Sequence, residues 1–250
     1  MGSLENCHEK LREILGNIEP IEVLRNVDEH RRFWRPDKVK TVLLAESHVS
    51  TGREEAALTI EFPPNISSSA PKSFVRLVYC LGYGENGLLQ NPIKNPPNSG
   101  TWQYWQVFHS CVNQVACNED FAAVQKTRTP DLCQRIRNKL QLLEELKQKG
   151  IWLVDGSLAA LYSPGRDKLP PKKLALTLQT SWGCYVRDQV VDAKPEQIIC
   201  IGEGVRQSLV SCFQKDCLHP TPVKQPNARM STQERFETFK KYFEICSGAR

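Results

Sequence analysis

Short, continuous apolar runs alternate along the chain with longer stretches whose apolar residues recur at helical spacing. Three of these runs, at residues 40–45, 151–154 and 197–201, each lead into polar or glycine-containing sequence. A strand that helices cover on both faces has this continuous pattern, as in a parallel sheet. A shorter fourth strand is expected at Cys217-Leu218, directly before a proline-rich loop. The pattern therefore predicts four strands.

The clearest helix is predicted over residues 129–149, where leucines and Ile136 form one apolar stripe. Thr129 is expected to cap this helix, Pro130 suits its first turn, and Gly150 ends it. The capping box that begins at Ser231 predicts a last helix. Further helices are expected over residues 4–24 with an interruption at Pro20, and over 74–81, 158–162, 174–191 and 205–213.

Strands that alternate with helices are typical of a three-layer α/β/α fold. We therefore predict a single domain over residues 1–250, with a four-stranded, mostly parallel central sheet. An N-terminal helical extension is expected at about residues 1–38. The chain has 250 residues, of which 40% are hydrophobic. This is enough for a sizeable core, so folding does not require a covalent cross-link.

Composition narrows the classes of partner. The net charge of +5 is compatible with an anionic partner. No run approaches the roughly 18 apolar residues of a membrane span, and the N-terminus is polar, so we expect a nuclear or cytoplasmic monomer without membrane contact. The ten cysteines are scattered and include no C-x-x-C pair, so reduced thiols are expected, with no metal and no cofactor.

A polar loop is associated with each predicted strand. In a parallel α/β sheet, ligands bind outside the carboxyl ends of the strands, so these loops are expected to converge on one site. The loops are Glu46–Ser50, Asp155–Ser157, Gly202–Gly204 and His219–Arg229.

The order of these loops resembles the uracil-DNA glycosylase superfamily. The matching segments are Leu43–His48, Trp152–Asp155, Ile199–Gly202 and His219–Pro222, and the likeness spans about residues 40–227. The resemblance implies a single glycosylase-like domain with a four-stranded parallel α/β/α fold. In that family the first strand runs into a catalytic motif and the second ends in a residue that reads the base. A His-Pro-Ser-Pro-like loop follows the fourth strand.

The resemblance also implies candidate catalytic residues. His219 would donate a hydrogen bond to the oxygen of the departing base, or else would simply bond the loop backbone. Ser47 stands where the family positions a water, but a serine is not a carboxylate, so Glu46 or Asp155 would have to compensate. Asp155 occupies the base-reading position, where an ionised carboxylate accepts hydrogen bonds from N–H groups. Glu46 and Asp155 would otherwise be helix caps.

Further residues are candidates for contact with the base or with DNA. Val223 stands where the family inserts a wedge into the minor groove, and Lys224 and Arg229 would contact phosphates or remain solvated. Gly202 would let a phosphate approach the backbone, or would only allow tight strand-to-helix packing. The other candidates are His48, Thr221 and Trp105, the last from an aromatic cluster (Trp102, Tyr104, Trp105 and Phe108) that would stack on a base or fill the core.

These residues together predict a DNA glycosylase that flips a damaged or deaminated base into a strand-end pocket and hydrolyses its N-glycosidic bond. Because Ser47 departs from the family pattern, the alternative is a non-catalytic member that binds nucleic acid or a nucleobase. A third hypothesis is an unrelated α/β enzyme acting on a small nucleotide. The glycosylase hypothesis requires His219, Asp155 and the Glu46–Ser47 turn to line one pocket with an aromatic wall.

Overall fold

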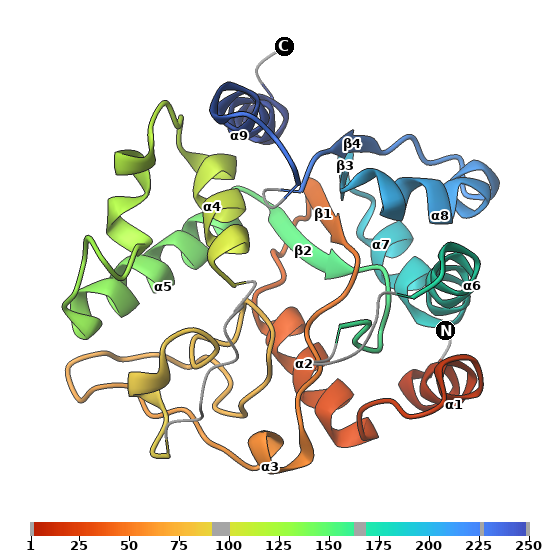
Figure 1. Ribbon diagram of the computed structural model, residues 1–250, viewed down its shortest axis with the longest axis horizontal. Helices are drawn as coiled ribbons and strands as arrows, with labels where there is room; N and C mark the ends of the chain where they lie inside the picture. Colours follow the sequence, from red (N-terminus) through yellow and green to blue (C-terminus); the bar gives the residue numbers. More distant parts are fainter. Residues whose placement is uncertain (1–2, 92–100, 163–168, 226–227, 249–250) are drawn as a thin grey trace.

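The structure, a computed structural model, describes residues 3–91, 101–162, 169–225 and 228–248. Its four strands are all parallel and lie in the order β2-β1-β3-β4. Helices cover both faces of the sheet, so the predicted three-layer α/β/α fold is confirmed (Figure 1). The strands are β1 (Thr41–Ala45), β2 (Ile151–Asp155), β3 (Gln197–Ile201) and β4 (Thr221–Val223).

The helices form two groups on opposite sides of the sheet (Figure 1). In one group α4 packs against α5 and α9, and in the other α6 packs against α1 and α8. No helix in the described part of the chain is long and apolar enough to cross a membrane. The α-helices are α1 (Leu4–Leu15), α2 (Ile21–Phe33), α3 (Arg53–Ala56), α4 (Thr101–Val112), α5 (Leu132–Gln148), α6 (Pro171–Ser181), α7 (Arg187–Ala193), α8 (Glu203–Lys215) and α9 (Thr232–Ser247). Short 3-10 helices lie at Asn86–Leu88 and Asn118–Val124, and a π-helical turn at Trp182–Val186 joins α6 to α7.

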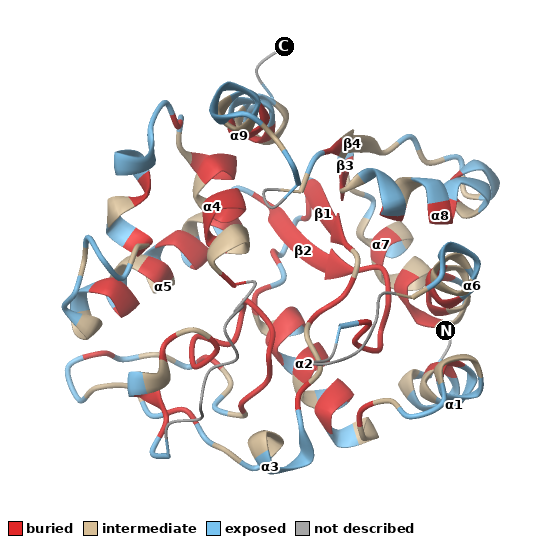
Figure 2. Ribbon diagram, viewed as in Figure 1, coloured by how far each residue is buried: buried red, intermediate tan, exposed pale blue. Residues whose placement is uncertain are grey.

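The sheet forms the centre of the core. Every residue of β1 and β2 is buried, and in β3 only Gln197 is exposed (Figure 2). The connection from β1 leads to β2 on one side, whereas the connection from β3 leads to β4 on the other. The carboxyl ends of β1 and β3 therefore flank the point where the sheet changes direction, which is the usual ligand crevice in such folds.

The fourth strand was predicted wrongly. It is not Cys217-Leu218 but Thr221–Val223, so His219 and Pro220 precede the strand rather than follow it. Cys217 adopts a left-handed backbone (φ 54°) in the turn after α8, which is incompatible with a strand. Pro222 lacks an N–H, but β4 is an edge strand and can tolerate this loss.

Helices are also absent from residues 74–81 and 158–162, where we expected them. In the second segment, side chains from elsewhere accept hydrogen bonds from two of the backbone amides. Ser181 Oγ accepts from Leu158 N at 2.8 Å, and Glu19 Oε2 accepts from Ala160 N at 3.1 Å. A short apolar run specifies burial but not its backbone conformation. The predicted cap of α5 was also displaced, because Asp131 rather than Thr129 accepts the first-turn amide.

Gly150 joins α5 to β2 in a conformation that favours glycine, with φ of +78°. A Cβ at this position would lie 2.7 Å from the backbone oxygen of Lys38, which cannot move aside. Gly150→Ala is therefore expected to lower the free energy of unfolding by about 1–3 kcal/mol in urea titrations. Gly183→Ala is the matched control, because a Cβ there meets nothing within 4 Å, and a similar loss in both variants would contradict the explanation.

Candidate functional site

The register of the sheet brings the ends of the strands to a common edge. Asp155 pairs with Ala45, and Val223 pairs with Ile201, so the residues that follow these positions lie at the carboxyl edge. Glu46 extends this edge beyond β1. Two of the predicted loops, those after β1 and β2, are bound to each other, since Ser157 N donates to Glu46 O at 3.0 Å.

A buried ionic network lies beneath this edge. His48 Nε2 lies 3.0 Å from Glu19 Oε2, and His48 Nδ1 lies 3.4 Å from Asp155 Oδ2. Arg31 donates to the same Asp155 oxygen at 2.8 Å. All four side chains are at most 3% exposed, so every charge depends on its partners rather than on water. Sequence reasoning missed Glu19 and Arg31, which come from the N-terminal segment.

Burial and pairing fix the charge states of this network. Burial by itself lowers the pKa of His48, but the carboxylates of Glu19 and Asp155 outweigh it and raise that pKa to about 9. Burial likewise opposes ionisation of both carboxyl groups. Nevertheless His48 lowers the pKa of Glu19, and Arg31 with His48 lowers the pKa of Asp155. At neutral pH the network therefore holds two cations and two carboxylates.

Ser47 is buried and its hydroxyl is used within the protein. Its Oγ donates to His48 O at 2.9 Å and accepts from Leu161 N at 3.0 Å. The single O–H donor is therefore used within the loop after β1, and the bond that the oxygen accepts from Leu161 N ties this loop to the segment after β2. This arrangement gives Ser47 a structural contact in place of the water-positioning geometry that the resemblance implied.

A small cavity of about 30 Å³ adjoins the network. Two of its lining residues carry buried nitrogens without an aligned hydrogen bond to the described residues, namely His48 Nδ1 and Arg76 Nη1. The Arg76 side chain is fixed by Glu55, because Arg76 Nε donates to Glu55 Oε2 at 2.9 Å. The lining residues are Ser47, His48, Val49, Arg76, Leu77, Val78, Tyr83, Thr101, Tyr104, Leu153 and Asp155.

Two tyrosines, Tyr83 and Tyr104, line this cavity, and a third, Tyr162, binds Glu46. Tyr162 donates its hydroxyl to Glu46 Oε1 at 2.8 Å. Burial raises the pKa of the half-buried Tyr104, and the charges of Asp155 and Glu46 raise it further. Tyr104 lines the cavity together with Asp155. Tyr83 is buried in the cavity wall. Tyr104 is thus the member of the predicted aromatic cluster that reaches the site.

Gly202 and Gln225 meet on the other half of the edge. Gly202 has φ of +96°, and its N–H donates to Val223 O at 2.7 Å. A Cβ on Gly202 would lie 3.1 Å from Gln225 Cγ, so glycine lets the Gln225 side chain lie over the end of β3. Gln225 was not predicted as a site residue, although it lies within the predicted loop His219–Arg229.

His219 lies away from this group. It is exposed and precedes β4, four residues before Val223, which is level with Asp155 in the register. Thr221, the first residue of β4, pairs with Ile199 in the middle of β3, and His219 comes two residues before it. His219 therefore lies toward the amino edge of the sheet and does not line the cavity with Asp155 and Ser47. Thr221 lies between them, half-buried in β4.

The remaining candidates divide between core and surface. Val223 is 3% exposed and Trp105 is 2% exposed, so neither is available as a wedge or a stacking platform. Trp105 instead packs edge-on against Phe108. Lys224 is exposed and lies 3.3 Å from Glu234, and Arg229 is exposed. Pro226 and Asn227, within the predicted loop, lie outside the described residues.

The structure thus brings together Glu46, Ser47, His48 and Asp155 from two strand ends, with Tyr104 beside them. It adds Glu19, Arg31 and Arg76 and leaves His219 apart. Comparisons with known protein families, with curated proteins and with solved structures found no match to this chain.

Proposed function

We propose that the protein binds a nucleobase at the carboxyl edge of its sheet, without a need for hydrolysis. The observation that carries this proposal is Arg76 Nη1, a buried cationic donor beside a cavity, with no hydrogen-bond partner among the described residues. An unsatisfied buried donor costs about 1–3 kcal/mol, which an acceptor on a ligand would recover. His48 Nδ1, which lies 3.4 Å from Asp155 Oδ2 without an aligned hydrogen bond, adds a second nitrogen beside the cavity.

The chemistry of the lining favours a base that carries a carbonyl next to an N–H group. Arg76 and His48 supply donors for the carbonyl, and the Asp155 carboxylate accepts from the N–H. The rings of Tyr83 and Tyr104 supply stacking surfaces. A volume of about 30 Å³ admits the edge of a base but not the whole ring, so binding requires the half-buried Tyr104 to move aside.

Binding of free bases and of oligonucleotides tests this proposal. Uracil, which has a carbonyl on each side of an N–H, is expected to bind more tightly than adenine, which has no carbonyl. Arg76→Lys keeps the charge opposite Glu55 but loses the planar fork, so it should weaken uracil binding about tenfold. His219→Ala is the matched control and should bind as the unaltered protein does. Equal affinity for uracil and adenine in calorimetry would overturn the proposal.

Glycosidic hydrolysis is the second candidate function, because Glu46 gives the edge a carboxylate outside the buried network. The Tyr162 hydroxyl orients this carboxylate, and Tyr104 lies beside it. A carboxylate in this place would position a water or stabilise positive charge on a sugar.

If hydrolysis occurs, Glu46→Gln is expected to slow release of base from a uracil-containing oligonucleotide by about 100-fold. His219→Ala should leave the rate unchanged, since His219 lies toward the other edge of the sheet. Alkaline cleavage of the abasic product on a gel measures both rates. The opposite pattern, with His219 essential and Glu46 dispensable, would restore the roles that the sequence implied. If the protein binds the oligonucleotide but releases no base, it recognises nucleic acid without hydrolysing it.

A further inference from the structure

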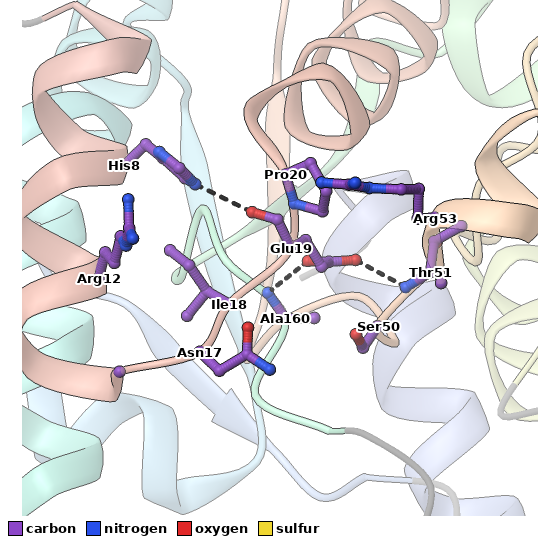
Figure 3. Close-up of a pocket in the computed structure, with 12 residues that line it drawn as sticks. His8, Arg12, Asn17, Ile18, Glu19, Pro20, Ser50, Thr51, Arg53 and Ala160 are labelled. Carbon is purple, nitrogen blue, oxygen red and sulfur yellow. Dashed lines mark hydrogen bonds between the residues drawn. The ribbon is translucent and has the colours of Figure 1, made fainter.

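A second and larger pocket, of about 840 Å³, adjoins the buried network at Glu19. One wall comes from α1, with His8 and Arg12, and the other comes from the loop after β1, with Arg53 at the start of α3 (Figure 3). Glu19 lies between the two walls. The pocket is therefore built from segments that are distant in sequence, and we call it the Arg12–Arg53 pocket.

The two arginines of this pocket have no acidic partner. Neither the Arg12 nor the Arg53 side chain forms an ion pair or hydrogen bond within the part of the chain that the structure describes, and both residues are exposed. Other exposed arginines do pair, for example Arg25 with Glu5 and Arg128 with Glu119. A guanidinium offers five N–H donors in a planar fork, so the pocket carries ten donors that no described group uses.

Glu19 does not cancel this positive charge, although it is the one acidic residue among the described residues of the lining. Its carboxylate is 2% exposed and accepts from Thr51 N at 2.7 Å and Ala160 N at 3.1 Å. Its charge is balanced on the far side by His48. His8 Nε2 donates to the backbone oxygen of Glu19 at 2.9 Å, which fixes the ring against the pocket floor (Figure 3).

We propose that the Arg12–Arg53 pocket binds the phosphate of a nucleotide-sized ligand. Guanidinium groups on two walls of one pocket suit a phosphate, whose oxygens accept bidentate hydrogen bonds. Ligand pockets measure roughly 300–1,000 Å³, so this volume holds a phosphate together with the group attached to it. The proposal goes beyond the nucleobase cavity, since Glu19 and His48 lie between the two and each site has its own cations.

The phosphate can belong to a free nucleotide or to a nucleic-acid strand, and both present the same chemistry. Calorimetric titrations with adenosine 5′-monophosphate, with an oligothymidylate of ten residues and with inorganic phosphate distinguish the sources. Each probe is titrated into the full chain and into R12Q, R53Q and R128Q variants. Arg128 is the matched control, because it is an exposed arginine elsewhere on the surface.

The expected result is that the monophosphate or the oligonucleotide binds, and that R12Q and R53Q each raise Kd about tenfold while R128Q does not. Binding of the monophosphate assigns the pocket to a free nucleotide, whereas binding of the oligonucleotide alone assigns it to a strand. An equal loss in R128Q, or no binding of any probe at low salt, overturns the proposal. The same titrations with Arg76→Lys keep the outcome separate from that of the nucleobase cavity, because this variant should retain phosphate binding.

Discussion

Replacement of Glu19 by alanine is expected to lower the free energy of unfolding by about 3–5 kcal/mol, since it removes the closer of the two carboxylates that pair with the buried cation His48. His48 would then pair only with Asp155, at 3.4 Å. The Asp155 carboxylate also pairs with Arg31, so it would have to balance two cations. The amides of Thr51 and Ala160 would lose their acceptor as well. Urea unfolding followed by circular dichroism measures the loss.

Two further variants divide this loss into its parts. Glu19→Gln removes the charge but keeps one oxygen, which serves only one of the two backbone amides, so its cost reports the ionic contribution together with one lost acceptor. Glu9→Ala removes an exposed carboxylate from α1 and should change stability by no more than about 0.5 kcal/mol. If Glu19→Ala costs no more than Glu9→Ala, the network does not hold the N-terminal segment to the sheet.

The central strands could be predicted from sequence. β1, β2 and β3 are buried on both faces, and such strands consist of a continuous run of apolar residues. The edge strand β4 has no such constraint. It is three residues long and contains Pro222, so its pattern resembles that of a loop. Because the strand was predicted too early in the sequence, His219 was expected at the carboxyl edge, whereas it precedes the strand. The same error misplaced the segment His219–Pro222, the most distinctive motif of the resemblance.

The site itself was predictable only where it follows a strand. Glu46 and Asp155 were found because they come directly after apolar runs. Arg31 and Arg76 come from other segments, whose hydrophobic patterns do not indicate which residues these arginines contact. Only the tertiary fold brings them to the network and the cavity. Tyr104 and Trp105 are neighbours, but one residue turns a helix by about 100°, so one reaches the site while the other enters the core.

The stability of the protein is expected to fall between about pH 6.5 and pH 9 because of His48. Its pKa rises from 6.5 to about 9 on folding, so its contribution is complete below pH 6.5 and is lost as the pH rises through 9. The opposite holds for Glu19 and Asp155. Folding lowers the pKa of each carboxyl group, so their contributions are lost as the pH falls below their ordinary values near 4.

Two other buried groups, His30 and Cys80, titrate outside this window. Burial lowers the pKa of His30 to about 4, so His30 changes the stability of the protein only below pH 6.5. Burial raises the pKa of the Cys80 thiol from 9.0 to about 11, so its effect begins above pH 9. Urea titrations at pH 5.5, 7 and 9 should therefore show a decline that disappears in His48→Gln and persists in His219→Gln. A decline of the same size in both variants would place its origin elsewhere in the protein.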